Sequence, residues 1–286
     1  MEYAAGSWEQ TLVAAQHADG GWGYGASGSW TEPTALAVLA LGASSNEGRR
    51  GIDWLTRVQR ADGGTAPHAS VAESSWVTAL ALLVDHSTGG AGRAGGARAW
   101  LLEQAGRETT LAERWRRWLH GTTSPELDLQ GWPWYPSTAG WAAPTAVTLA
   151  ALKLSTGSAD AEAVRRMGAG RAFLLSRAAS KGGWNHGSIR VFDIEGAAYP
   201  ETTGCALVGL RGERGPAIEL AIERSRVWIG QARSAPSWAW LRLGLLAHGI
   251  DAGPKEPGVA PANPAETALA LLARRATPAE SALWRV

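Results

Sequence analysis

The chain has 286 residues, a formal net charge of +1 and a single cysteine, Cys205. A charge this close to zero creates no field that would attract nucleic acid, and one cysteine cannot form an internal disulfide. No N-terminal stretch has the pattern of a signal peptide, and no apolar run approaches the roughly 18 residues of a spanning helix. We therefore expect a cytoplasmic protein that does not bind nucleic acid.

A repeated unit organises the chain, and residues 12–42 contain its first copy. An apolar helix end leads into the turn QHADGGWG at residues 16–23, and a second helix opens at TEP, residues 31–33. Asp-Gly-Gly favours a tight turn because glycine accepts positive φ, and proline suits the first turn of a helix. A second copy covers residues 54–83, and its distance from the first is typical of repeat architectures. Looser copies begin near residues 130, 181, 236 and 264.

The hydrophobic pattern along the chain predicts helices and almost no strands. The segment 87–98 is glycine-rich and is expected to be a loop, residues 107–140 to be an insertion, and 189–192 is the one strand-like stretch. The expected helices cover residues 7–17, 32–42, 47–60, 73–85, 97–106, 111–119, 144–155, 159–179, 201–211, 216–232, 237–248, 264–274 and 277–285.

The helices alternate between two kinds. One kind is amphipathic and carries arginines on a wet face, whereas its partner is rich in alanine and leucine on all sides and must be buried. Five to six such pairs can close into a ring with the apolar helices inside. The sequence thus predicts an all-α protein, a single α/α toroid domain over residues 1–286. The inner helices should begin near Glu32, Glu73, Pro144, Glu201 and Ser237, with 47–60, 159–179 and 216–232 outside.

The turn at residues 16–23 resembles the QW repeat of squalene and oxidosqualene cyclases. The stretch GGWNHG at 182–187, followed by YPETTG at 199–204, is similar to bacterial prenyltransferase/squalene-oxidase repeat proteins. These families share the α/α toroid with the β subunits of protein prenyltransferases. The resemblance implies a terpene-cyclase-like protein that takes an apolar, isoprenoid molecule into its ring.

Two chemical signatures of these families are missing. Class II terpene cyclases protonate their substrate with an Asp-x-Asp-Asp motif at the start of an inner helix, and this motif occurs nowhere in this chain. The equivalent position of the first repeat has the sequence Glu32-Pro33-Thr34-Ala35. Protein prenyltransferases hold zinc with an Asp-x-Cys pair, but Thr203 stands two residues before Cys205. We therefore predict no bound metal and no cofactor.

Four glutamates share one predicted position, the N-terminal end of a buried helix: Glu32, Glu73, Glu201 and Glu266. In a ring they would gather at one rim, either as acids at a cavity mouth or as partners of the helix dipoles. We predict Glu201 or Glu32 as the acid of a cyclisation or isomerisation. Glu201 is expected to lie buried under the loop 184–200, with a raised pKa and with His186 or Tyr199 in hydrogen-bond reach.

Tryptophan is unusually abundant, with 16 residues against 4 tyrosines and 2 phenylalanines. Those of the repeated turns are expected to be structural, whereas a second group is expected to line the cavity and bind the substrate, because aromatic faces stabilise cations. The predicted substrate-binding residues are Trp76, Trp134, Trp141, Tyr199 and Trp238.

Other interpretations remain open from the sequence. The basic helix 111–119 could contact a membrane surface or a diphosphate, although such a charge run is more often a solvated face. The toroid could also be a non-catalytic module that binds a partner protein on its rim. A third alternative is carbohydrate processing, with tryptophan stacking and paired carboxylates.

Overall fold

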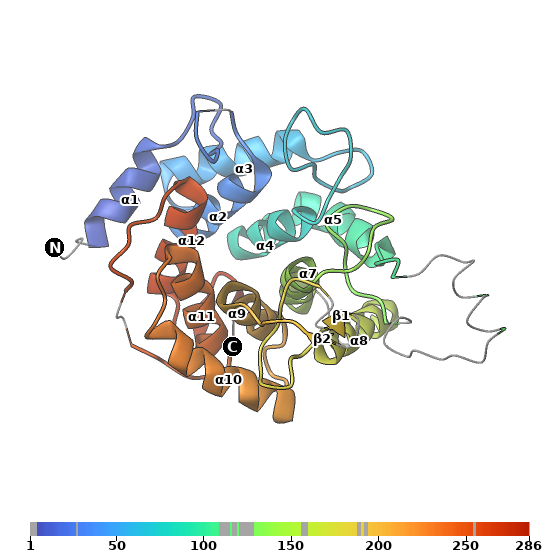
Figure 1. Cartoon of the computed structure of the whole chain (residues 1–286). Coiled ribbons are helices and arrows are strands. Elements are labelled where there is room, and N and C mark those ends of the chain that lie inside the picture. The colour runs from blue at the N-terminus through green and yellow to red at the C-terminus, as the bar shows by residue number, and fades with distance from the viewer. Residues whose placement is uncertain are drawn as a thin grey trace.

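The computed structural model describes residues 5–26, 28–108, 115, 119, 129–155, 160–187, 190–191, 194–253 and 256–285. Six of the described helices form an inner ring, in which each helix contacts the next and the last contacts the first (Figure 1). In order around the ring they are α2 (Thr31–Leu41), α4 (Thr78–Thr88), α7 (Ala142–Ser155), α9 (Pro200–Gly209), α11 (Ala235–Ala247) and α12 (Pro264–Arg275).

Five described helices lie outside this ring. They are α1 (Ala5–Ala14), α3 (Asn46–Val58), α5 (Ala91–Glu103), α8 (Ala161–Ser176) and α10 (Pro216–Ile229). The contrast between α2 and α3 explains the two layers: every residue of α2 except Glu32 is buried, whereas α3 buries mainly the face that carries Trp54 and Leu55. The predicted all-α toroid is therefore confirmed, with α12 as a sixth inner helix that the predicted inner set did not include.

The repeated turns hold each outer helix to the inner helix that follows it. The indole N–H of Trp22, which is fully buried, donates to the carbonyl of Leu12 at 2.8 Å. Trp132 and Trp184 repeat this bond at 2.7 Å with the carbonyls of Leu101 and Leu174. The structural role expected for these tryptophans is confirmed.

A threonine in the first turn of four inner helices fixes the register of the repeat. The hydroxyl of Thr34 accepts a hydrogen bond from the backbone N–H of Trp22 at 2.9 Å and lies 3.2 Å from its carbonyl. Thr78, Thr145 and Thr203 repeat the bond with the backbone N–H groups of residues 65, 132 and 184.

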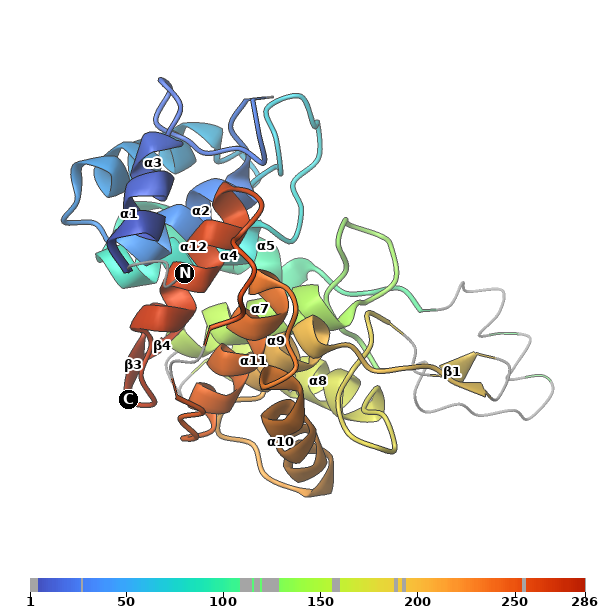
Figure 2. The ribbon, with the colours of Figure 1, turned by 60° about the vertical axis from the view of Figure 1, so that its left-hand side comes forward.

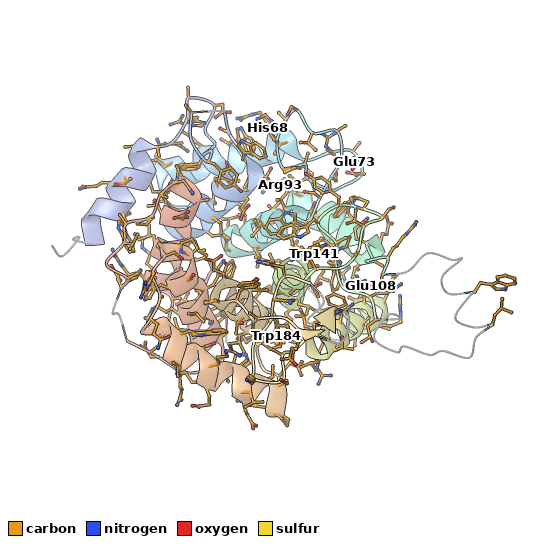
Figure 3. The ribbon with its side chains drawn as sticks, in the orientation of Figure 1. His68, Glu73, Arg93, Glu108, Trp141 and Trp184 are labelled. Carbon is orange, nitrogen blue, oxygen red and sulfur yellow. The ribbon has the colours of Figure 1, made fainter. Side chains whose placement is uncertain are left out.

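This register corrects the predicted start of the second inner helix. Counted back from the shared threonine, the residue equivalent to Glu32 is Trp76, whereas Glu73 is exposed on the loop before α4 (Figure 3). The helix begins late because Ser74 donates to the carboxylate of Asp62 at 3.0 Å and the N–H of Ser75 bonds the carbonyl of Thr65. These bonds keep the chain extended up to Ser75.

Two other local predictions of secondary structure are wrong, and a third lies mostly outside the described residues. The glycine-rich segment expected as a loop over 87–98 is wrong in its second half, since α5 starts at Ala91. The helix expected over 277–285 is wrong as well: the chain forms a hairpin of β3 (Glu280–Ser281) and β4 (Trp284–Arg285). The helix at 111–119 falls outside the described residues except for Trp115 and Leu119, which are helical and exposed.

The ring has two different ends (Figure 2). The loops that precede the inner helices gather at one end, beside the hairpin of β1 (Arg190–Val191) and β2 (Ile194–Glu195). The β3–β4 hairpin lies at the opposite end. None of the described helices is long and apolar enough to cross a membrane.

Candidate functional site

A cavity of about 210 Å³ opens at the loop end of the ring. Its lower wall is built from apolar side chains of five inner helices: Leu36, Leu80, Val147, Cys205 and Leu269. Its upper part carries the polar side chains Glu32, His186, Glu201 and Thr202. The cavity thus combines an apolar pocket with a small polar rim, which is the usual construction of a small-molecule site.

Three indole rings complete the cavity wall. Trp76 and Trp134 meet edge to face, with ring centroids 4.8 Å apart, and the backbone N–H of Trp76 bonds the carbonyl of Trp134 at 3.1 Å. Trp240 of α11 lines the cavity from another side. Trp76 and Trp134, both predicted binding residues, therefore line the cavity at the end of the ring where the inner helices begin.

Glu32 is the carboxyl with the most unusual surroundings at this rim. It is partly buried in the first turn of α2 and lines the cavity. Loss of water on burial raises the pKa of Glu32, and the hydrogen bond that the Tyr24 phenol donates to its carboxylate opposes this only in part. Burial together with the Glu32 charge raises the pKa of Tyr24 in turn. Glu32 is thus a predicted acid whose carboxyl loses water on burial at the cavity rim.

Glu201 stands at the same mouth in a different environment. Its side chain is exposed and accepts a hydrogen bond from the hydroxyl of Ser237 at 2.9 Å. The prediction that Glu201 is buried is wrong, because its side chain is exposed to solvent. His186 pairs with the hydroxyl of Thr202 at 3.1 Å, rather than with Glu201, and stacks on Tyr199 at 5.0 Å.

The other predicted binding residues lie away from the cavity wall. Trp238 points into the protein core and is 1% exposed, because it lies two positions before Trp240 and so on another face of α11. Trp141 is partly exposed beside Gly187 (Figure 3), and Tyr199 is exposed outside the mouth.

Sequence reasoning missed the place of Tyr24 and Cys205 in the site. It grouped Trp240 with the indoles at inner-helix starts that could face a shared cavity but did not count it among the binding residues. Tyr24 comes from the loop between the first turn and α2, where no periodic signal predicts a contact with Glu32. Cys205 was interpreted as a small buried residue; it is buried, but its side chain also lines the cavity.

The thiol and carboxyl groups of the cavity do not form a set of metal ligands. Among the described residues, no group of three or more His, Cys, Asp or Glu side chains is arranged to hold a metal ion. Burial and the neighbouring Glu32 charge raise the pKa of Cys205 to about 12, which disfavours the thiolate that a metal would need.

Comparison with known proteins places the chain by its fold. No family model and no curated protein matched the sequence. A solved structure of the type II terpene cyclase MstE from Scytonema aligns over 94% of this chain and 77% of its own, with 16% identity and a TM-score of 0.55. A further MstE structure contains geranylgeranyl dihydroxybenzoate as substrate.

Two glycosidases share the same architecture. An α-amylase from Clostridium perfringens aligns over 96% of this chain and 98% of its own, with 10% identity and a TM-score of 0.63. The family 8 endoglucanase Cel10 from Klebsiella pneumoniae aligns over 94% and 99%, with 14% identity and a TM-score of 0.55. At these identities the likeness establishes the fold and not the reaction. The chain is an α/α toroid of the kind that terpene cyclases and several glycosidases share.

Proposed function

We propose that the protein binds a short isoprenoid in the ring cavity and that Glu32 protonates it to begin a cyclisation or an isomerisation. The observation that carries this proposal is a carboxyl with a raised pKa at the rim of an apolar, tryptophan-lined cavity. A space of about 210 Å³ holds roughly seven carbon-sized groups if each occupies about the volume of a water molecule. This corresponds to between one and two isoprene units.

The proposed chemistry is a proton transfer to a carbon–carbon double bond. The Glu32 carboxyl gives its proton to one alkene carbon, the π electrons form the new C–H bond, and a cation remains on the other carbon. The faces of Trp76, Trp134 and Trp240 would stabilise this cation by roughly 0.5–2 kcal/mol each. Return of a neighbouring proton to the Glu32 carboxylate forms a new double bond and restores the acid.

Glu201 and His186 receive a different role in this proposal. Both line the polar rim, where Glu201 is exposed and His186 is fixed by Thr202. We therefore assign these two side chains to hydrogen bonding with the polar end of the ligand.

The test uses geraniol in heavy water, an alkene alcohol of ten carbons whose apolar end would fill the cavity while its hydroxyl end would stand in the open mouth. Protonation of the alkene introduces deuterium at carbon, which mass spectrometry of the products detects. Glu32→Gln should lower this incorporation about 100-fold or more, because it removes a general acid. Glu73→Gln is the matched control, because Glu73 is exposed on the loop before α4 and does not line the cavity, and it should retain most of the incorporation. Undiminished incorporation by Glu32→Gln would end the assignment of Glu32 as the acid.

The site of binding can be checked independently of turnover. Cys205 is the only cysteine of the chain and lies on the cavity wall. Geraniol bound in the cavity should slow the alkylation of Cys205 by N-ethylmaleimide at about pH 9, a pH chosen because the buried thiol ionises little at neutral pH. Mass spectrometry follows the alkylation. An alkylation rate that saturating geraniol leaves unchanged would contradict binding in the ring.

Carbohydrate processing is the second candidate, and one observation favours it. Two carboxyl side chains, Glu32 and Glu201, and three indoles line one mouth, as a sugar site would require. The apolar wall below them favours the isoprenoid instead, and an open cavity argues against a ring that serves only as a scaffold. Release of reducing sugar from maltohexaose or cellohexaose, lost in both Glu32→Gln and Glu201→Gln, would establish the sugar alternative.

A further inference from the structure

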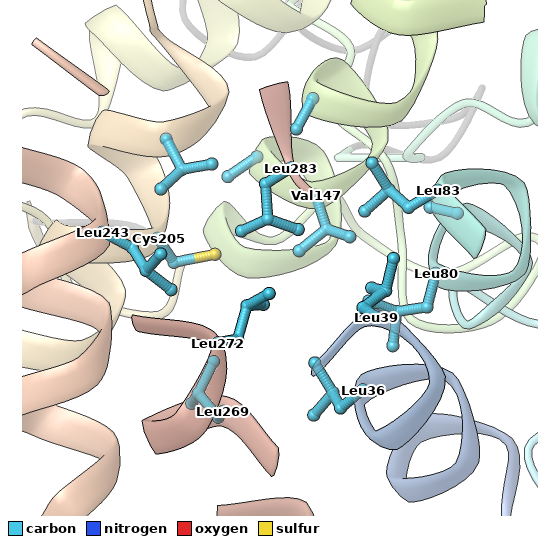
Figure 4. Packing of buried hydrophobic residues seen from close by; sticks show 14 of the residues in the cluster. Leu36, Leu39, Leu80, Leu83, Val147, Cys205, Leu243, Leu269, Leu272 and Leu283 are labelled. Atoms are coloured by element: carbon cyan, nitrogen blue, oxygen red, sulfur yellow. The ribbon is translucent and has the colours of Figure 1, made fainter. Parts of the chain in front are cut away.

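The end of the ring opposite the mouth is closed by the hairpin of β3 and β4. Leu283, in the turn between the two strands, is 4% exposed, and Trp284 is 2% exposed. Figure 4 shows the Leu283 side chain in the middle of the ring of apolar side chains, near Val147 and between the helices that carry Cys205 and Leu83. A segment outside the helical repeat therefore fills the centre of the toroid from below.

Leu283 lies directly beneath the ligand cavity. A remaining space of about 10 Å³ is lined by Leu283 together with five residues that also line the cavity, namely Leu36, Leu80, Val147, Cys205 and Trp240. The same space is lined by Leu83, Ala150 and Val208, each three residues further along its helix than a cavity residue. Three residues span about 4.5 Å of an α-helix, so Leu283 stands about one helical turn below the main cavity.

We propose that Leu283 is the floor of the cavity and determines the length of the apolar chain that it accepts. This inference rests on the proposed binding of an apolar ligand. A space of about 10 Å³ has room for at most about one more carbon group, so a longer chain must leave its extra methylenes at the mouth, in water. Those methylenes then contribute nothing to affinity.

The hairpin backbone keeps its conformation through bonds that do not involve the Leu283 side chain. The N–H of Thr277 bonds the carbonyl of Glu280 at 2.8 Å, and the N–H of Leu283 bonds the hydroxyl of Ser281 at 3.2 Å. The strands pair Glu280 with Arg285 and Ser281 with Trp284. A substitution at Leu283 should therefore change the floor while the ring helices and the mouth stay in place.

The test measures binding of linear primary alcohols, from 1-hexanol to 1-tetradecanol, by isothermal titration calorimetry. In the wild type, the Kd should fall about fourfold for each added methylene until the chain reaches Leu283, and should then stop falling. Leu283→Ala removes three carbon atoms and should move this cut-off out by about two to three carbons. Leu283→Phe enlarges the floor and should move the cut-off in by at least one carbon.

Leu82→Ala is the matched control. Leu82 is a fully buried leucine of α4 that lines neither space, so the same deletion should leave the cut-off where it is in the wild type. Circular dichroism checks that each variant is folded. If Leu283→Ala unfolds, the proposal is tested by Leu283→Phe alone, for which the cut-off should be at least one carbon shorter than in the wild type.

The outcomes separate the two proposals. Alcohol binding with the same cut-off in the wild type and the folded Leu283 variants overturns the role of Leu283 and leaves the proposed cavity intact. Absence of binding for every alcohol in every protein overturns both the cavity ligand and its floor.

Discussion

Glu32 and Glu201 occupy equivalent positions in two copies of the repeat, each two residues before the threonine that bonds the preceding turn. Their surroundings nevertheless differ. Glu32 is partly buried against Tyr24, whereas Glu201 is exposed and bonds a serine hydroxyl. Desolvation disfavours the charged form of a carboxyl and raises the pKa of Glu32, while the hydrogen bond from Tyr24 opposes this rise in part. Two equivalent positions of the repeat therefore place a glutamate in two different environments.

The raised pKa of Glu32 predicts a pH dependence of stability. In the folded state Glu32 keeps its proton to a higher pH than in the unfolded chain, so stability falls as the pH rises from the ordinary glutamate pKa through the folded one. Glu32→Gln does not titrate. Its free energy of unfolding, relative to the wild type, should therefore increase across this range and stay constant below it. Urea unfolding from about pH 4 to pH 8 measures the difference.

The comparison cancels the contributions of other groups. Burial also raises the pKa of Asp85, although Arg93 opposes the shift, but Asp85 titrates in both proteins. A difference between the two proteins that does not change with pH would contradict the raised pKa of Glu32.

At the scale of the element, the inner helices are attached to the turns through single hydroxyl groups. The Thr145 hydroxyl accepts the buried N–H of Trp132 at 2.8 Å, and three further helices repeat this bond. Each threonine therefore fixes both where a helix starts and how its preceding turn is oriented. Because the side chains of the mouth come from these first turns, the same bonds fix the rim of the cavity.

Two threonines of α7 provide a matched test of this attachment. Thr145→Val leaves the buried N–H of Trp132 without its acceptor and should cost about 1–3 kcal/mol of stability. Thr148 is equally buried in the same helix, but its hydroxyl has no hydrogen-bond partner among the described residues. Thr148→Val should accordingly be neutral or stabilising in urea unfolding. Equal losses in both variants would show that the hydroxyl bond is unimportant.

A close approach of two helices positions Trp240. A Cβ atom on Gly204 of α9 would stand 2.2 Å from the backbone of Trp240, and one on Gly244 of α11 would stand 2.7 Å from the carbonyl oxygen of Gly204. Only glycine allows this distance between the helix axes. The two glycines therefore bring the Trp240 indole to the cavity wall.

At the scale of the whole molecule, the ring is closed by arginines of its last two helices. Arg242 of α11 is buried, and its guanidinium donates to the carbonyl of Ala273 in α12 and to the carboxylate of Asp251 at 2.9 Å. Arg275 at the end of α12 donates to the carbonyl of Ala40 in α2 and to Glu9 of α1. The Arg275 bonds join α12 to the first repeat, whereas the Arg242 bonds hold α11 to α12 and to the loop that follows α11.

The attachment of α11 to α12 in the ring can be tested at Arg242. Arg242→Met keeps much of the side-chain length but leaves the buried carbonyl of Ala273 without its donor, and should cost about 1–3 kcal/mol. Arg226→Met is the control, because Arg226 forms only an exposed pair with Glu223 and should change stability by less than about 0.5 kcal/mol. Urea unfolding measures the free energy of unfolding of both variants. Similar losses of stability would contradict the role of Arg242 in holding α11 to α12.

The sequence by itself determined the two-layer ring and its repeated turns. Helix α2 is apolar on all sides and α3 is not, so their relative burial follows from the hydrophobic effect alone. The buried tryptophans of the turns and the helix starts at Thr31, Pro200 and Pro264 could likewise be predicted, because each depends on residues close in the chain. Glu32 and Trp76 were identified as site candidates on the same grounds.

Only the tertiary structure decided which candidates share one cavity. The predicted helix start at Glu73 is wrong because Ser74 and Ser75 form hydrogen bonds to the preceding turn that delay the start of α4. Their partners, Asp62 and Thr65, lie about ten positions earlier in the chain. The raised pKa of Glu32 comes from burial in the ring, and its hydrogen-bond donor Tyr24 folds back from a loop without periodicity. Leu283 was expected in a closing helix, yet it fills the ring from a hairpin. Desolvation and cavity depth arise from side chains that meet only in the folded ring, so no local pattern encodes them.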